Sequence, residues 1–224
     1  MKKRFSYIID TIKYHFCKNF KVEKSRIKWI IYNINPSTKI KISNSAIYHC
    51  TFTDMGNSNK IIINDNTSLS YSSIVVEGTG NSVVLDGCNG CVTIIIKGNN
   101  CSVSIGKGTT MEDLYIVCKG PDDAVIIGED CMFAGCVEIW GSDTHRITDL
   151  DNNPINYSLP VKLENHIWVG KHAKILKNTT IGSGAVVGMC SVVTHNVPAN
   201  SVVAGNPAKI IKQNIQWHRG YIGI

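Results

Sequence analysis

Between residues 169 and 193, a β-branched aliphatic residue returns at every sixth position. The residues of this series are Val169, Ile175, Ile181, Val187 and Val193. An α-helix would repeat after about 3.6 residues and a half-solvated strand after about 2, so neither explains a period of six. A parallel β-solenoid explains it, because short strands joined by tight corners return to the same environment at a fixed interval. The pattern therefore predicts a mainly β chain that winds as a solenoid.

Small residues and glycines complete each hexad. The fourth position after an aliphatic residue holds Ala173, Thr179, Ala185 or Ser191. Glycine follows the aliphatic residue directly three times, at Gly170, Gly182 and Gly188. We expect the aliphatic residues to fill the core and the small residues to fit where the wall turns. The glycines are expected to supply positive φ angles at the corners.

The hexad is weaker between Thr38 and Val117, where Ile, Val, Asn, Ser and Gly are frequent. Three similar fragments begin at Gly56, Gly80 and Gly98, which are 24 and then 18 residues apart. Eighteen residues are three hexads, or one coil of a triangular solenoid. This region is therefore predicted to be a solenoid with irregular coils, and asparagine suits their corners because it accepts left-handed backbone angles.

The repeat fails between residues 141 and 165, where polar and turn-forming residues include two prolines. An excursion of this length inside a repeat array indicates a functional segment. The hexads resume at Ile167 and close near Lys209, so we expect the solenoid to span residues 36–212 and a short tail to span 213–224.

Residues 1–35 show a different pattern. Apolar residues recur at spacings of three and four, with lysines between them: Phe5, Ile8, Ile9, Ile12, Phe16 and Phe20. This spacing predicts a basic amphipathic helical segment that ends before Asn35-Pro36. Two interpretations stay open, a helix on an anionic membrane surface or partner enzyme through residues 1–32, and a cap on the open end of the solenoid.

Composition and charge narrow the class of protein. Of 224 residues, 43% are hydrophobic and 18% charged, which is typical of a soluble globular protein. The net charge of +6 comes from the first thirty residues, so nothing in the main body suggests nucleic-acid binding. We expect a cytoplasmic protein with possible peripheral membrane contact, because the chain shows neither a long apolar run nor a secretory signal.

Nine cysteines stand at irregular spacings. Their odd number and their positions in apolar strands favour reduced, buried thiols over disulfides. Cys88 and Cys91 form a CxxC pair, but no second pair stands at zinc-ligand spacing, so no metal is expected.

Three segments together resemble one known family. They are the IWVG sequence at 167–170 with its hexads, the closing segment VVTHNVPANSVVAGNPAKIIK, and EIWGSDTHRITD around His145. The chain resembles the hexapeptide-repeat acyltransferases, in particular the sugar O-acetyltransferases of galactosides, maltose and capsule or O-antigen polysaccharides. This resemblance implies a single-stranded left-handed parallel β-helix, a homotrimer and acetyl-CoA as acetyl donor.

The resemblance also implies roles for individual residues. His145 matches the catalytic base, and Trp168 matches a tryptophan near that base and the acyl group. Positions that contact coenzyme A in the family are Trp168, Lys171, Gly188, Met189, Thr194, Gly205, Lys209 and Lys212. The usual Thr-Lys-Asp after the last hexad is replaced by Thr194-His195-Asn196, and lysines replace the frequent C-terminal arginines, which removes a bidentate phosphate contact.

The residues around His145 fit acetyl transfer to a hydroxyl. A sugar hydroxyl does not ionise near neutral pH, and a neutral imidazole can remove its proton as the new bond forms. Asp143 either orients the His145 ring or caps the turn. Trp140 and Tyr157 either stack on a sugar acceptor or pack the excursion.

The predicted function is acetyl-CoA-dependent O-acetylation of a bacterial surface-polysaccharide sugar by direct attack on the thioester. Two alternatives stay open at the level of sequence. One is N-acetylation of an amino sugar, or serine acetylation. The other is a non-catalytic β-solenoid that serves as a binding module.

Overall fold

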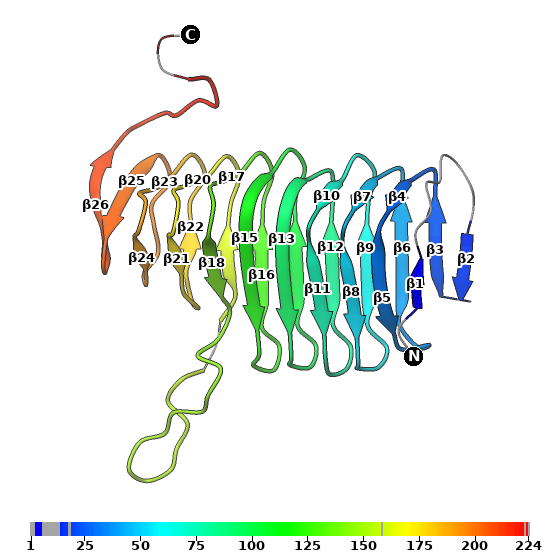
Figure 1. The fold of residues 1–224 in the computed structure, drawn as a ribbon. Helices are drawn as coiled ribbons and strands as arrows, with labels where there is room; N and C mark the ends of the chain where they lie inside the picture. The colour runs from blue at the N-terminus through cyan, green and yellow to red at the C-terminus, as the bar shows by residue number, and fades with distance from the viewer. Residues whose placement is uncertain (1–2, 6–13, 18, 158, 222, 224) are drawn as a thin grey trace.

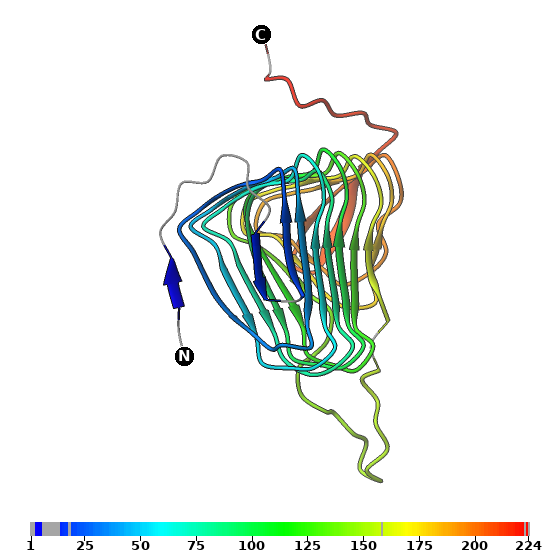
Figure 2. The ribbon, with the colours of Figure 1, turned by 90° about the vertical axis from the view of Figure 1, so that its right-hand side faces the viewer.

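A computed structural model of the chain describes residues 3–5, 14–17, 19–157, 159–221 and 223. Between residues 20 and 205 the chain winds as a parallel β-solenoid of about eight coils (Figure 1). Viewed along its axis, each coil is a triangle with three faces and three corners (Figure 2). The predicted β-solenoid is therefore confirmed.

The first face holds one parallel strand from each coil. Its strands are β3 (Phe20–Glu23), β6 (Lys39–Ser43), β9 (Lys60–Ile63), β12 (Ser82–Leu85), β14 (Ser102–Ile105), β16 (Ala124–Ile127), β19 (Val161–Leu163) and β22 (Thr180–Ile181).

The second and third faces follow in each coil and belong to one continuous sheet. The second face consists of β4 (Arg26–Lys28), β7 (Ala46–Tyr48), β10 (Ser68–Ser70), the beginnings of β13 (Asn89–Ile96) and β15 (Thr110–Cys118), β17 (Met132–Phe133), β20 (Trp168–Val169), β23 (Val186–Val187) and β25 (Ser201–Gly205). The third face consists of β5 (Ile30–Ile34), β8 (Thr51–Asp54), β11 (Ser73–Val76), the ends of β13 and β15, β18 (Val137–Trp140), β21 (Lys174–Ile175) and β24 (Val192–Val193). We call the turn after each face the first, second and third corner.

Antiparallel strands cover both ends of the stack. At the N-terminal end β1 (Lys3–Phe5) pairs with β5 and β2 (Tyr14–Cys17) pairs with β3. At the other end β26 (Ala208–Gln213) pairs with β25. These strands occupy edges that would otherwise offer unpaired backbone groups to other chains.

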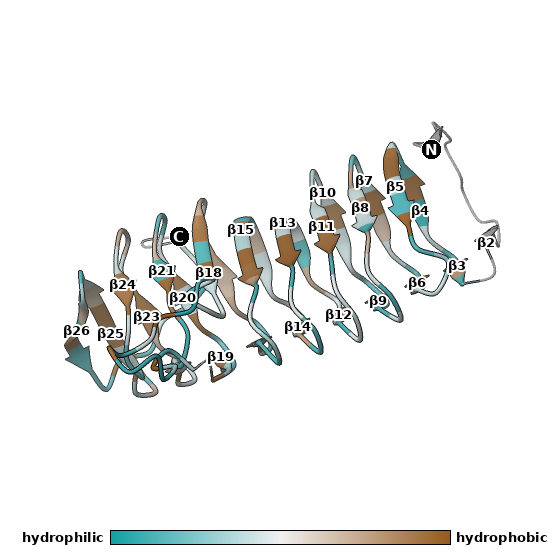
Figure 3. Cartoon of the chain, turned by 90° about the horizontal axis from the view of Figure 1, so that it is seen from below, coloured by the Kyte–Doolittle hydropathy of each residue, from teal (hydrophilic) through white to brown (hydrophobic). Residues whose placement is uncertain are grey.

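The hexad assignment of core positions is confirmed. All five aliphatic residues of the series from Val169 to Val193 are at most 1% exposed, and the four small residues are fully buried. Along the strands, buried and more exposed residues alternate. Figure 3 colours the same strands by the hydropathy of each residue. The expectation for the hexad glycines is wrong, because positive φ is found instead at His172, Gly184 and Cys190.

Close backbone approach explains the hexad glycines. A Cβ atom added to Gly170 would lie 2.6 Å from the backbone nitrogen of Met189, and one added to Gly182 would lie 2.5 Å from that of Ala199. These glycines therefore allow neighbouring coils to approach closely at the corner, while other residues adopt the left-handed backbone conformation.

The earlier coils are longer than three hexads. Partners in neighbouring coils of the first face are 22, 20 and 22 residues apart, from Lys60 to Ser82, Ser102 and Ala124. Strands of four residues replace the two-residue strands of the later coils. The extra residues explain why the predicted irregular region keeps the fold but loses the period of six.

Buried polar side chains stack along the third corner of these coils. Asn59 accepts a bond from the backbone N–H of Asn81 at 2.8 Å, and Asn81 accepts one from that of Cys101 at 2.8 Å. The Asn81 amide also donates to the carbonyl groups of Gly98 at 2.9 Å and Glu77 at 3.0 Å. Each asparagine thus satisfies backbone groups that would otherwise be buried without a partner.

The predicted N-terminal helix is wrong for the described residues. Strands β3, β4 and β5 form a first coil N-terminal to residue 36, with Phe20 and Val22 buried and Lys21 and Glu23 exposed. This alternation has a period of two, and apolar residues four apart satisfy it as well as they satisfy a helix. Residues 1–2, 6–13 and 18 of the predicted helix lie outside the described residues.

The described part of the chain contains no helix that is long and apolar enough to cross a membrane.

The excursion leaves the solenoid at the third corner after β18 and extends away from the coils (Figure 1). It returns at Val161, where β19 pairs with β16. The predicted end at residue 165 is therefore too late, because Val161 and Leu163 already belong to the core.

We predict that Asn81→Ala lowers the free energy of unfolding by about 2–4 kcal/mol, because it leaves buried backbone groups without partners. Guanidinium titration followed by circular dichroism measures this. Asn89→Ala is the control: Asn89 is exposed, and its replacement should change stability by at most about 0.5 kcal/mol. Equal stability of the two variants would contradict the assigned role of the buried ladder.

Candidate active site

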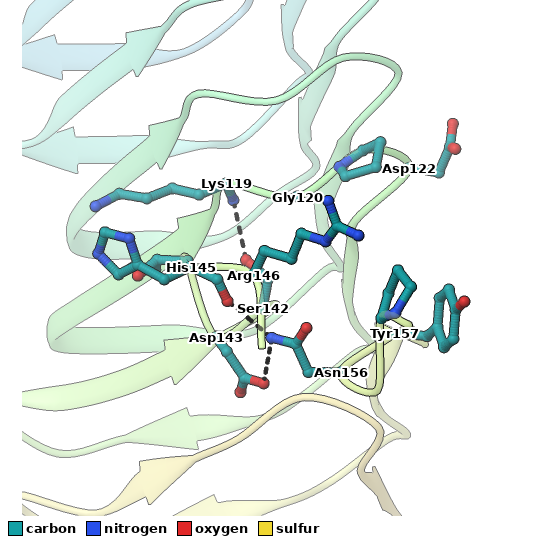
Figure 4. A pocket seen from close by; sticks show the side chains of 12 residues that line it. Lys119, Gly120, Asp122, Ser142, Asp143, His145, Arg146, Asn156 and Tyr157 are labelled. Carbon is teal, nitrogen blue, oxygen red and sulfur yellow. Dashed lines mark hydrogen bonds between the residues drawn. The ribbon is translucent and has the colours of Figure 1, made fainter. Parts of the chain in front are cut away.

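The excursion places His145 just outside the third corner, on a short frame of hydrogen bonds. The backbone N–H of His145 donates to the carbonyl of Asp143 at 2.8 Å. The Asn156 amide donates to the carbonyl of His145 at 2.8 Å and to the Asp143 carboxylate at 3.0 Å (Figure 4). Asp143 also forms an ion pair with Lys177 at 2.7 Å. This frame ties the backbone of His145 to the solenoid wall, because Lys177 follows β21.

The Asp143 carboxylate is directed at the frame and does not bond the His145 ring. Burial raises the pKa of Asp143, but the hydrogen bonds from Lys177 and Asn156 outweigh burial, so the pKa lies below its usual value. Asp143 is therefore ionised at neutral pH and holds the loop, which is the turn-capping alternative left open by the sequence. The imidazole of His145 has no hydrogen-bond partner among the described residues. Its ring nitrogens are thus available to a ligand.

A cavity of about 540 Å³ opens beside His145. Its lining includes Lys119, Arg146, Asn156 and Tyr157, so two cationic side chains share the hollow with the imidazole (Figure 4). Arg146 also donates to the carbonyl of Asn152 at 3.1 Å within the excursion. Asp122 and Asp143 also line the hollow, but Asp143 is already paired with Lys177. Lys119 and Arg146 can therefore face a polar acceptor that carries negative charge, with a candidate base at its side.

Trp168 lies elsewhere on the same chain. It stands on the second face, is 39% exposed, and borders a separate cavity of about 440 Å³ with Met132, Thr110 and Ala134. The strand that carries it starts from the first corner, whereas His145 follows the third corner. The structure of one chain thus does not bring His145 and Trp168 together.

Several candidate coenzyme residues lie near one another at the C-terminal coils. Strand register aligns Trp168 with Val186, then Val202, then Lys212. Gly188 donates its N–H to the carbonyl of Val203 at 2.8 Å, beside the hairpin of Gly205 and Lys209.

Three other coenzyme candidates, and the acceptor candidate Trp140, stand apart from this row. Met189 and Lys171 are exposed at the second corner, where the Cys190 N–H donates to the Lys171 carbonyl at 2.9 Å. Thr194 follows β24 toward the third corner and its hydroxyl bonds His195 at 2.8 Å. Trp140 donates to Glu138 at 2.8 Å and packs against Tyr115, so it is held on the third face and does not line the cavity beside His145.

Comparison with known proteins decides the family. No protein-family model matches the chain. A polysialic acid O-acetyltransferase of Neisseria meningitidis is 34% identical over 186 residues, which are 80% of this chain and 85% of that relative. The chain belongs to the hexapeptide-repeat acetyltransferases.

Two further comparisons agree with this membership. A polysialic acid O-acetyltransferase of Escherichia coli O1:K1 is 36% identical over 126 residues, which are 56% of this chain and 41% of that relative. The solved structure of the polySia-specific acetyltransferase NeuO matches with a TM-score of 0.75 and 32% identity, over 85% of this chain and 88% of that one. The family resemblance predicted from the motifs is confirmed, and the chain is an acetyltransferase.

Sequence reasoning missed several residues of the site. Lys119, Asn156 and Lys177 meet around His145 from three separate segments, and no motif links them. One signal was available for Lys177. It follows β21, and β21 pairs with β18, the strand that leads into the excursion.

The cysteines of this acetyltransferase are free thiols in the described part of the chain. Burial raises the pKa of Cys88 to about 12, and that of Cys50 and Cys131 to about 11, so these thiols are protonated at neutral pH. Cys91 bonds the carbonyl of Tyr71. Among the described residues, no three His, Cys, Asp or Glu side chains lie close enough to hold a metal ion.

We predict that Asp143→Asn speeds amide hydrogen exchange of residues 142–157 by about twofold to fivefold, the range expected for a partly exposed ion pair. A lowered folded pKa means that the stabilisation is complete above the unfolded pKa of about 3.9 and disappears as pH falls through the folded value. The two proteins should therefore differ at pH 6 and converge in strong acid. Asp122→Asn, in the same cavity lining, is the control and should leave exchange unchanged.

Proposed function

We propose that this acetyltransferase moves the acetyl group of acetyl-CoA to a hydroxyl of a bacterial capsule polysaccharide, with His145 as general base. The observation that carries the proposal is the unpartnered imidazole of His145 beside an open polar cavity. The two relatives act, by their names, on polysialic acid, which is an anionic polymer. The cationic Lys119 and Arg146 in the cavity lining fit an anionic acceptor of this kind.

The chemistry follows from the weak acidity of the sugar hydroxyl. Neutral His145 accepts the hydroxyl proton while the oxygen attacks the thioester carbonyl, which forms a tetrahedral intermediate. The intermediate then expels the coenzyme A sulfur, and the imidazolium returns the proton to it. This route needs no acyl-enzyme, and the buried thiols, with raised pKa values, are poor nucleophiles.

Acetyl-CoA would lie along the second face. The row from Trp168 to Lys212 crosses three strand spacings of about 4.8 Å each, or roughly 14 Å, a length suited to an extended pantetheine arm. Trp168 would border the acetyl group at one end. Lys212 and Lys209 would meet phosphates at the other end as point charges. Gly188 and Gly205 flank this path, and Lys171, Met189 and Thr194 are assigned to it by family resemblance alone.

The proposal includes a left-handed winding, a cytoplasmic homotrimer, and a site shared by two chains. His145 and Trp168 stand at different corners of one rigid coil stack, so a common site requires a second copy. A cyclic trimer repeats the same heterologous contact three times, which would place His145 of one chain opposite Trp168 of the next.

His145→Ala should reduce release of coenzyme A thiol from acetyl-CoA by at least about 10³-fold with an anionic capsule polysaccharide as acceptor. Its assembly state and unfolding midpoint should not change, because the ring has no hydrogen-bond partner among the residues that the structure describes. His172→Ala is the matched control, an exposed histidine at the second corner. Undiminished turnover by His145→Ala would refute the proposed base. Loss of the product in mild alkali identifies an ester, whereas an amide would survive.

Mixed assemblies test the shared site. His145→Ala and Trp168→Ala chains should each be nearly inactive alone. After joint refolding, about one in four junctions of a randomly mixed trimer unites an intact His145 with an intact Trp168, so about one quarter of wild-type turnover should return. No recovery, with mixed trimers shown by mass spectrometry, would place both residues in a single-chain site.

A further inference from the structure

The C-terminal segment turns back after β26 and runs along the first corner. The N–H of Ile215 donates to the carbonyl of Asn200 at 3.0 Å, in the last turn of the solenoid. Trp217 then meets His166, and Arg219 meets Asp130 and Gly108, which occupy the first corner of successively earlier coils. We call residues 215–219 the strap, because it crosses several coils at one corner.

Trp217 is the buried anchor of the strap, with 6% of its surface exposed. Its ring stacks on the His166 ring at 4.1 Å with an interplanar angle of 9°, and its Nε1–H donates to the His166 carbonyl at 2.9 Å. Trp217 also contacts Trp168: their ring centres lie 6.1 Å apart and their planes form an angle of 44°. The separation and tilt are those of a favourable aromatic pair.

Charged groups fix the strap beyond Trp217. His166 bonds the Asp130 carboxylate at 2.6 Å and the Trp217 carbonyl at 3.1 Å. Arg219 donates to Asp130 at 2.7 Å, to the Thr110 hydroxyl at 2.9 Å and to the Cys131 carbonyl at 2.9 Å. Arg219 therefore links the strap to two neighbouring coils, and a network of this kind holds a segment better than an isolated surface pair does.

The strap contacts two residues of the cavity beside Trp168. Thr110 and Trp168 line that cavity, and each is in contact with a strap residue. Trp168 stands on a flat wall, and its one aromatic neighbour in the described part of the chain is Trp217. Without Trp217, the half-exposed indole would have no ring against it to fix its rotamer.

We infer that the strap is a positioning element for acetyl transfer, in which Trp217 holds the indole of Trp168 in the orientation that receives the acetyl donor. This inference rests on the proposed role of Trp168 beside the acetyl group. It assigns a function to tail residues that lie outside the hexads and outside the segments of family resemblance.

The test compares Trp217→Ala, Trp217→Phe and Arg219→Gln with the wild-type enzyme. The KM and the calorimetric Kd for acetyl-CoA should rise about threefold to tenfold in Trp217→Ala, the range that loss of one aromatic pair allows. The KM for the polysaccharide should stay constant. Trp217→Phe should fall between, and Arg219→Gln should reproduce part of the effect because it releases the strap while both indoles remain. Tyr221→Ala, an exposed residue of the same tail, is the control and should behave as wild type.

A spectroscopic readout separates positioning from stability alone. Two indoles this close should give an exciton signal in circular dichroism, which Trp217→Ala and Trp168→Ala should both abolish. A lower unfolding midpoint for Trp217→Ala with unchanged acetyl-CoA affinity would overturn the inference and leave the strap as a structural tie. Activity of His145→Ala would refute His145 as the base. The exciton signal and the acetyl-CoA affinities would still decide the role of Trp217.

Discussion

Hydrogen bonding between successive coils is the constraint on which this structure depends. The backbone of each strand finds its partners in the coils before and after it, so equivalent residues stack at one strand spacing. An inward position therefore repeats an apolar residue, and a buried corner position repeats a small or hydrogen-bonding residue. The Asn59–Asn81 ladder and the row of fully buried small residues from Ala173 to Ser191 are two solutions to this requirement.

The same constraint decides where functional groups can stand. Strand residues that point outward lie in straight rows, which suit an extended ligand. A corner can admit extra chain, because the strands on either side keep their partners. The excursion does this between β18 and β19, and β19 still pairs in register with β16. The strap uses a different corner and adds Trp217 from outside the coils.

The sequence predicted those features that recur at a fixed spacing along the chain. The later hexads identified the aliphatic core residues and the small buried residues correctly, but not the residues with positive φ, and the motif around His145 identified the loop that carries it. The N-terminal residues were misassigned because apolar spacings of three and four suggested a helix, whereas the described strand β3 alternates with a period of two, with Phe20 and Val22 buried. Other residues were missed for a different reason: Lys177 and Trp217 have partners far away in sequence, and Asn156 bonds within the excursion, which follows no repeat.

Rigid stacking also bears on how a complete site could arise. His145 and Trp168 are separated by the first face of the solenoid, and its strands are paired on both sides. A movement that joined the two residues within one chain would have to break these ladders, and each buried backbone group left unpaired costs about 1–3 kcal/mol. Docking of a second copy costs no internal hydrogen bond. For the proposed site, assembly is therefore the less costly route, and the strap and the frame around His145 would each prepare one half of it before the chains meet.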